Sequence, residues 1–387
     1  MTEFHPYDEL TWPEVQSLPR HAPIILTLGT GYPTSQIAEA LGNPTDAYLL
    51  PPFPFGWQGS GLQITEIYLA SYITNLINSL RDDGFMNTLV VTPPGLYLNL
   101  PVPWISLPQY SGKTETSFLP PETEMGKVVL IPIGHIEQHG YHLPLSTDTM
   151  IIDAIAQGVA EAVQDQVTCL PVMPYGVSTH RPSFAGTLNA GGRAFEDFWL
   201  DVIDVLAGRG FHLFYLISGH GGNSSFITNV VKYAGERHRR IFCATTWLYL
   251  SGPAGIASLK KHRQSRIGGM GHACELETSF MLHLQPSLVH MERVVDETNF
   301  LSTPNYYMDW VEGGALIANP PWDDDTRTGA YGAGSLATAE KGEIWLQAAI
   351  DEKITHIQEI HQQHQMRQAR RNDGYGLWGQ DKSKMDG

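Results

Sequence analysis

Cysteine is scarce in this sequence, and features that would send a chain to a membrane or out of the cell are missing. The three cysteines, Cys169, Cys243 and Cys274, are an odd and widely spaced set that does not make a disulfide framework. The N-terminus MTEFHPYDEL has no basic start followed by an apolar core, and no apolar run reaches the ~18 residues that span a bilayer. These absences predict a cytoplasmic globular protein.

Basic residues are few as well. The 387 residues include 24 lysines and arginines against 40 aspartates and glutamates, which gives a formal net charge of −16. This balance argues against nucleic acid or an anionic membrane surface as the main partner.

Three widespread catalytic motifs are absent. The sequence has no G-x-S-x-G, no G-x-x-x-x-G-K-[ST] and no G-x-G-x-x-G after a strand. Serine hydrolase, nucleotidase and dehydrogenase interpretations therefore lack support.

From about Lys127 onward, apolar runs alternate with segments of helical periodicity. The runs predict strands and the periodic segments predict helices, in this order: strand 127–133, helix 149–163, strand 167–173, helix 195–210, strand 211–218, helix 224–238 and strand 241–250. This alternation predicts an α/β fold with a mostly parallel sheet flanked by helices. Ligands in such folds lie at the carboxyl ends of the strands.

The N-terminal third resembles the later part closely enough to predict a degenerate repeat. Three blocks match in the same order: PIILTLG (23–29) with VVLIPIG (128–134), LLPPFPFG (49–56) with CLPVMPYG (169–176), and residues 76–94 with 202–220. Chance likeness between two α/β segments is the alternative. If the repeat is real, the first copy has lost its chemistry, because Tyr32, Thr34 and Pro94 stand where the second has Glu137, His139 and His220.

The segment IGHIEQHGYHLPLSTD (133–148) is unusually rich in potential metal ligands. Glu137 and His139 are two residues apart, so on an extended segment both side chains point the same way. Asp148 follows just before a predicted helix, where it is either a ligand or the helix N-cap. His135 and His142 stay unassigned, as structural or supporting residues.

Three more clusters follow predicted strands. SGHGGN contains His220, with Gly221 beside it and Asn223 as a helix cap or as support for a ligand. GHACELETS contains His272, a natural proton shuttle, with Glu275 and Glu277; the acidic pair is also typical of a helix start. The loop 175–192 lacks ligand spacing, and we interpret its residues His180, Gly186 and Thr187 as lying on the substrate side.

Together these clusters place carboxylates and imidazoles at several strand ends of one α/β unit. Such ligands suit Zn, Mn or Fe rather than Ca, and they are numerous enough for two ions that share one carboxylate. A pair of this kind polarises a carbonyl and makes hydroxide available near neutral pH.

The motifs IPIGHIEQHGYHLPLSTD, SGHGGN and HACELETS, in this order, resemble the creatininase (creatinine amidohydrolase) family over about residues 125–350. The resemblance implies a creatininase-like α/β fold, one or two divalent metal ions per chain, hydrolysis of cyclic or formyl amides, and usually a hexamer. By position it implies that Glu137, Asp148 and His220 bind one metal. His139 and Asp148 bind the other, so that Asp148 bridges them.

The same resemblance implies that His272 is the catalytic histidine, with Glu277 as the carboxylate near it. Two departures from creatininase proper stand out. Gly222 replaces a glutamate ligand, so the second ion is weak, absent or completed by Glu275 or Glu277. Gly268 replaces a tryptophan that closes over the ligand, which puts creatinine itself in doubt.

We therefore predict a metal-dependent hydrolase that opens a small cyclic substrate by attack of metal-bound hydroxide on a carbonyl. The alternatives are C–C ring opening of a cyclic ketone such as 3-dehydro-scyllo-inosose, formamide deformylation, and a non-enzymatic binding protein. The predicted assignments are catalytic His272 and Glu275; metal ligands Glu137, His139, Asp148, His220 and Glu277; and substrate-side His180, Gly186, Thr187, Gly221 and Asn223.

The predicted organisation is a non-catalytic unit 1–120, a catalytic domain 121–370 and a tail 371–387. The loop-like stretch 300–335 is predicted as an active-site loop, with a surface excursion as the alternative. We expect a homo-oligomer, smaller than a hexamer if the N-terminal unit blocks that assembly.

Overall fold

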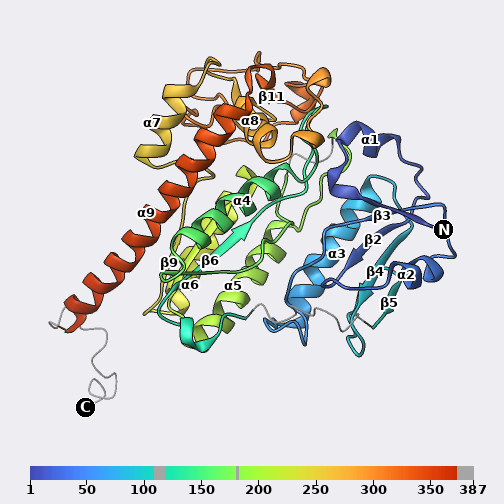
Figure 1. Cartoon of the computed structure of the whole chain (residues 1–387), viewed down its shortest axis with the longest axis horizontal. Helices are drawn as coiled ribbons and strands as arrows, with labels where there is room; N and C mark the ends of the chain where they lie inside the picture. Colours follow the sequence, from blue (N-terminus) through green and yellow to red (C-terminus); the bar gives the residue numbers. More distant parts are fainter. Residues whose placement is uncertain (109–118, 180–182, 373–387) are drawn as a thin grey trace.

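Figure 1 shows the computed structural model of the chain, which describes residues 1–108, 119–179 and 183–372. The strands are β1 Glu3–Pro6, β2 Ile24–Thr27, β3 Asp46–Leu49, β4 Thr88–Thr92, β5 Trp104–Ser106, β6 Val128–Ile133, β7 Val167–Cys169, β8 Leu213–Ser218, β9 Phe242–Thr245, β10 Met270–His272 and β11 Tyr331–Gly332. The helices are α1 Trp12–Ser17, α2 Thr34–Ala40, α3 Glu66–Asp82, α4 Thr147–Ala162, α5 Gly192–Gly208, α6 Ser224–Arg237, α7 Pro253–His262, α8 Glu275–Leu284 and α9 Ala339–Asn372.

Apolar runs that are buried on both faces form the strands of two parallel sheets. All residues of β4, β6 and β8 are buried, as expected for strands covered by helices on either side. The first sheet has the order β1-β3-β2-β4-β5 and the second β7-β6-β8-β9. Every pair in both sheets is parallel, which confirms the predicted fold class.

The two sheets repeat one another in strand register. In the first sheet a β-bridge joins Leu28 to Phe53, and in the second a β-bridge joins Ile133 to Met173. These four residues are the ones that the sequence match pairs with each other. The same holds within the ladders, where β2 meets β3 and β4 in the register in which β6 meets β7 and β8. The common order and register favour the predicted repeat, although parallel α/β sheets often share such an order, and the repeat stays a prediction.

The helices α3 and α5 extend this correspondence. Both have 17 residues, and each end of α5 lies 126 positions after the matching end of α3. The rings of Tyr72 and Phe198, which occupy matching positions, pack against each other with centroids 4.9 Å apart. The Tyr72 hydroxyl donates to the carbonyl of Tyr175 at 2.7 Å. The two units therefore meet through like helices and share one hydrophobic core.

In the predicted first copy, other residues stand at the positions that match the candidate ligands. The Tyr32 ring is buried, and its hydroxyl donates to the Leu28 carbonyl at 2.6 Å. Thr34 begins α2, and Pro94 follows β4. The predicted boundary near residue 120 lies in the connection from β5 to β6, part of which is outside the described residues, and the domain division stays a prediction.

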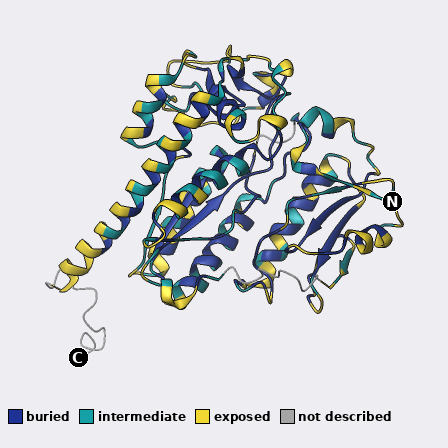
Figure 2. Cartoon of the chain, viewed as in Figure 1, coloured by how far each residue is buried: buried dark blue, intermediate teal, exposed yellow. Residues whose placement is uncertain are grey.

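After β9 the chain builds a layer over one end of the second sheet (Figure 1). This layer contains α7, α8, the start of α9 and the antiparallel pair β10–β11. The 34-residue α9 runs back along the second sheet, and its far end is largely exposed (Figure 2). Of the predicted tail 371–387, the first two residues belong to α9 and the remainder lie outside the described residues.

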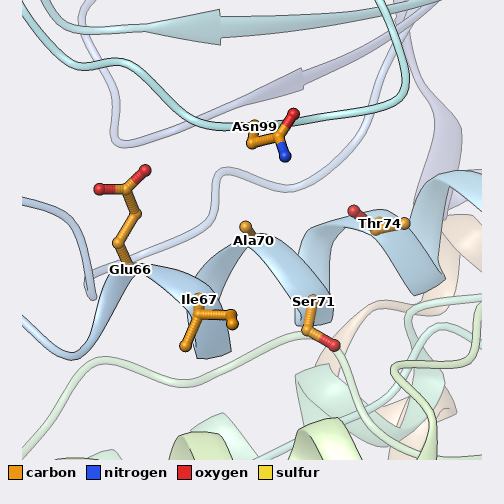
Figure 3. A pocket seen from close by; sticks show the side chains of 6 residues that line it. All are labelled: Glu66, Ile67, Ala70, Ser71, Thr74 and Asn99. Atoms are coloured by element: carbon orange, nitrogen blue, oxygen red, sulfur yellow. The ribbon is translucent and has the colours of Figure 1, made fainter.

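The exposed face of α3 forms an open pocket, lined by Glu66, Ile67, Ala70, Ser71, Thr74 and Asn99 (Figure 3). On α5 the matching face is covered by α6, where the Asn229 amide donates to Glu196 at 2.7 Å. The first copy has no helix between β4 and β5, so this face of α3 stays open. Among the described helices, none has the length and apolar character of a membrane span.

Candidate metal centre

The candidate ligands after β6 lie in an irregular loop whose backbone is held by hydrogen bonds. The Glu137 amide donates to the Leu145 carbonyl at 3.0 Å, and the Gln138 amide donates to the Thr187 hydroxyl at 3.0 Å. Glu137 and His139 are 1% and 0% exposed. The loop is thus fixed on both sides of the two ligand side chains.

The first donor set consists of Glu137, Asp148 and His220. His220 Nδ1 lies 2.9 Å from Glu137 Oε2 and 3.1 Å from Asp148 Oδ2. Its other nitrogen, Nε2, donates to the Val177 carbonyl at 3.1 Å. A backbone carbonyl that holds one ring nitrogen turns the other toward the metal, which is the usual arrangement of a ligating histidine. Nδ1 is therefore the nitrogen that faces both carboxylates.

The second donor set shares Asp148 with the first. His139 Nε2 lies 3.1 Å from Asp148 Oδ1, and its Nδ1 donates to the Glu137 carbonyl at 2.9 Å. Ligand atoms of His139, Asp148 and Glu277 lie within 4.8 Å of one another. Each oxygen of Asp148 thus faces a different histidine, as a bridging carboxylate requires.

The chemistry of these donors fits divalent metal ions. Glu137 Oε2 and Asp148 Oδ2 are buried and, in the described structure, have only the His220 ring nitrogen as a partner, and Glu277 Oε1 is buried there without a hydrogen-bond partner. Buried carboxylate oxygens are costly unless a donor or a cation compensates them. Three such oxygens beside two imidazoles make a mixed oxygen and nitrogen set that suits Zn, Mn or Fe.

Without a cation, protons balance the charge of the carboxylates. Burial alone lowers the pKa of His220, but Glu137 and Asp148 raise it to about 10. In the same way Asp148 outweighs burial and raises the pKa of His139 to about 9. Burial raises the pKa of Glu277 to about 7, although the positive charge of His139 opposes this shift. A divalent cation would displace these protons, because ligands bind metal in their deprotonated form.

His272 is at the end of β10, beside both donor sets. Its Nε2 donates to the Gln138 carbonyl at 2.6 Å, and its ring packs against His139 with centroids 4.2 Å apart. The His272 ring and the Trp322 indole meet at a steep angle, with centroids 4.9 Å apart. Burial and the positive charge of His139 lower the pKa of His272 to about 4. A neutral imidazole with one nitrogen anchored can accept a proton at the other.

Asp148 is not the N-cap of α4. Ser146 occupies the N-cap position, and Asp148 is the second residue of the helix. Of the two interpretations open in the sequence, the helix-cap one is wrong, and the side chain faces the histidines instead.

The two unassigned histidines of the loop are buried and held by other groups. His135 Nδ1 accepts the Gly176 amide at 3.1 Å, and its ring stacks on His220 with centroids 4.2 Å apart. His142 Nε2 forms a hydrogen bond with the Thr278 hydroxyl at 2.9 Å. Both positions are typical of residues that support the ligands.

The structure does not bring Glu275 into the ligand cluster. Its carboxylate accepts from the Lys341 ammonium at 2.6 Å and from the amides of Gln264 and Ser265 at 2.9 and 2.8 Å. With Lys341 and two amides as its partners, Glu275 stabilises the start of α8. These contacts give no support to the catalytic role predicted for it.

Several residues predicted on the substrate side form hydrogen bonds that hold the backbone near the candidate ligands. Thr187 holds Gln138, and the Gly186 amide, at φ +94°, donates to Asp83 at 2.8 Å. Asn223 makes no cap hydrogen bond; its Oδ1 accepts the Val177 amide at 2.8 Å. Gly221 begins the 3-10 helix after β8. His180 lies outside the described residues.

Gly222 leaves no room for a side chain. A Cβ atom there would lie 2.4 Å from His220 Nε2 and 2.5 Å from the Val177 oxygen. Those two atoms form the hydrogen bond that orients His220. A glutamate at this position is thus incompatible with the observed backbone. The other carboxylate that lies close to His139 and Asp148 is that of Glu277.

Two aromatic residues near the cluster carried no signal in the sequence. Trp322 belongs to the predicted loop 300–335, which reaches His272 and is therefore not a mere surface excursion. Tyr249 is buried, and its hydroxyl donates to the Gly219 carbonyl and lies 3.4 Å from Asp148 Oδ1. Neither has a spacing relative to the ligands that identifies it.

The part of the chain that contains these donor sets is similar to known proteins. Residues 119–357 match the family described as creatininase, creatinine amidohydrolase. Creatinine amidohydrolase of Pseudomonas putida is 30% identical over 243 residues, covering 58% of this chain and 85% of that protein. The 3-dehydro-scyllo-inosose hydrolase of Thermotoga maritima is 28% identical over 253 residues, covering 58% of this chain and 74% of that protein.

Solved structures show the same similarity. A tryptophan-to-alanine mutant of creatininase aligns with a TM-score of 0.52 and 26% identity, covering 62% of this chain and 93% of that one. A structure described as creatininase Mn aligns with a TM-score of 0.50 and 25% identity, covering 62% of this chain and 93% of that one. The family match begins at residue 119, so the first parallel sheet lies outside it.

Proposed function

The chain belongs to the creatininase family of hydrolases, and from this premise we propose that it opens a small cyclic substrate by hydrolysis at a carbonyl carbon, with the C–N bond of a cyclic amide as the bond cleaved. The observation that carries this proposal is the pair of buried donor sets that share Asp148 beside a neutral histidine.

Glu137, Asp148 and His220 would hold one divalent ion, and His139, Asp148 and Glu277 the other. When bound, Zn, Mn or Fe polarises a carbonyl and lowers the pKa of a coordinated water. A creatininase structure described as containing Mn supports a divalent metal in this chain.

His272 is the group we propose to move the proton. One of its ring nitrogens lies within 4.8 Å of ligand atoms of Glu137 and His139, which puts it beside any molecule bound there. In hydrolysis the water oxygen bonds to the carbonyl carbon while His272 takes the proton of the water. The C–N bond then breaks, and His272 returns that proton to the leaving nitrogen. Its anchored Nε2 keeps the ring in one orientation throughout.

C–C ring opening of a cyclic ketone is the second candidate. The observation that favours it is Gly222, which separates this chain from creatininase proper, together with the likeness to 3-dehydro-scyllo-inosose hydrolase. In that reaction the proton of the water goes to the leaving carbon instead of a nitrogen.

Metal analysis of the purified chain and of two variants tests the proposal. We expect His220→Ala to lose bound metal because it removes a ligand, and His272→Ala to keep the metal but lose turnover. His238→Ala is a matched control, since His238 pairs only with Asp204 in the described structure, at 2.6 Å, away from the ligand cluster.

The substrate screen should include cyclic amides, formamides and inosose-type ketones. If wild-type protein holds fewer than about half an ion per chain and gains no activity with added Zn, Mn or Fe, the proposal is wrong. If both histidine variants keep their metal, the ligand assignment is wrong.

A further inference from the structure

A short N-terminal segment, residues 7–17, lies against the loops of the metal centre although it precedes the family match at residue 119. We propose that Trp12, in this segment, is a positioning residue: it holds an aromatic wall against His272 and so determines which cyclic substrates the centre accepts. The kinetic part of this inference rests on the proposed hydrolase function.

The segment is joined to the ligand loop through the main chain. The Leu145 amide donates to the Leu10 carbonyl at 2.9 Å, and the Ser146 amide donates to the Asp8 carbonyl at 2.9 Å. Ser146 is the N-cap of α4, two residues before the bridging Asp148. The loop that carries the ligands therefore ends on a segment from the other half of the chain.

Trp12 itself connects three loops. Its Nε1 donates to the Thr328 carbonyl at 2.8 Å. Its ring meets Phe184 edge-on at 5.2 Å and Tyr141 at 5.4 Å. These partners come from the ligand loop, the substrate-side loop and the loop 300–335, so one indole holds the three together.

Phe184 also belongs to a buried aromatic cluster that reaches His272. Phe184, Trp322 and Tyr331 form one buried cluster against which Trp12 packs. Trp322 lies with its ring 4.7 Å from Tyr331 and 4.9 Å from His272. Trp12 is thus linked to His272 through one buried aromatic cluster, which Phe184 joins to Trp12 and Trp322 joins to His272.

The loop that bears Trp322 has little regular structure of its own. Between Arg293 and Tyr331 the described chain has a single short 3-10 helix, Trp322–Asp324, as its only helix or strand. Its position therefore depends on side-chain contacts such as those of Trp12. Because offset and edge-on ring pairs have preferred geometries, removing one ring shifts its neighbours as well.

The experiment compares Trp12→Leu with Trp104→Leu in the full chain. Trp104, on β5, is also a half-buried tryptophan of the first unit. Its described ring contact is with Tyr97, at 5.5 Å between centroids, and both residues are distant in the sequence from the candidate ligands. Hydrogen–deuterium exchange should become about tenfold faster in residues 138–146 and 320–331 of Trp12→Leu only. This readout needs no substrate.

With a substrate from the screen, Trp12→Leu should lower kcat/KM about tenfold, mainly through KM, and should change the preference between a small and a bulky cyclic amide. Bound metal per chain should stay at the wild-type level. Trp12→Phe, which keeps a ring but loses the bond to Thr328, should retain the preference in part. Trp12→Phe also replaces Trp12→Leu in both measurements if Trp12→Leu does not fold.

Equal exchange and kinetics in Trp12→Leu and Trp104→Leu would overturn the inference. Loss of metal in Trp12→Leu would overturn it too, because the segment would then support the ligands rather than the aromatic wall. A wild-type chain that shows neither bound metal nor turnover would contradict the proposed function instead. The hydrogen–deuterium exchange measurement would still test whether Trp12 holds the aromatic wall in place.

Discussion

Replacing Gly222 by alanine should disable the first donor set, although it adds a single methyl group. The added Cβ would lie 2.4 Å from His220 Nε2 and 2.5 Å from the Val177 oxygen, and real Cβ contacts are essentially never shorter than 3.0 Å. The Val177 oxygen belongs to a backbone held by Asn223, so the histidine ring is the part that must move. We therefore expect the hydrogen bond between them to break.

The magnitude follows from what that bond does. It holds Nε2 so that Nδ1 faces Glu137 and Asp148, and loss of such an orienting partner typically weakens metal binding about 10- to 100-fold. The same clash implies that Gly222→Glu does not restore a second carboxylate ligand but weakens the centre at least as much. This outcome is the opposite of what the likeness to creatininase proper suggests.

The neighbouring residue, Gly221, provides a matched control for Gly222→Ala. At Gly221 a Cβ would meet only Trp247 and Leu248, at 3.6 and 3.9 Å, which are ordinary contacts. Zinc affinity measured by competition with a chromogenic chelator should fall in Gly222→Ala and stay at the wild-type level in Gly221→Ala. Affinities of the two variants within about twofold of each other would refute the reasoning, because His220 would then not need its Val177 partner.

Three further predictions concern charge. At pH 7 zinc binding should release between two and three protons per chain into weakly buffered indicator solution, because without metal the pKa values of His220 and His139 are about 10 and about 9 and that of Glu277 is about 7. A measured release of no protons would contradict this protonated, metal-free state. Since the pKa values of His220 and His139 are raised above about 6.5, the stability that the protonated rings give the metal-free chain is complete below about pH 6.5 and lost toward pH 9–10, which thermal unfolding across this range should show. Glu275→Gln should lower the free energy of unfolding by about 1–3 kcal/mol in urea, because Lys341 stays buried, while metal content stays unchanged; a stable variant that has lost turnover would restore the catalytic role of Glu275.

The strand-end clusters were readable in the sequence because parallel strands bring their carboxyl ends to one edge. Glu137, His139 and His220 follow β6 and β8, which are neighbours in the sheet. The choice between Glu275 and Glu277 was not readable. Residues two apart on a helix point about 200° away from each other, so only one can face the cluster, and the tertiary packing of α8 decides which.

The aromatic contacts between residues far apart in the sequence could not be predicted from the sequence for another reason. Trp322 lies 50 positions after His272, and Trp12 lies more than 250 before it, so no spacing links them to the site. The repeat, in contrast, was visible because its register is kept by buried apolar residues that matched block by block. Local pattern thus predicts elements and strand ends, whereas loop-borne aromatic contacts depend on the assembled core.

The contact between α3 and α5 also bears on how the protein behaves on dilution. Two separate copies that met through such helices would dissociate as their concentration fell. Here both copies belong to one polypeptide, and a tether of this kind holds its ends at an effective concentration on the order of millimolar. The packing between the halves, and the Trp12 segment that depends on it, should therefore be as complete in a nanomolar solution as in a concentrated one.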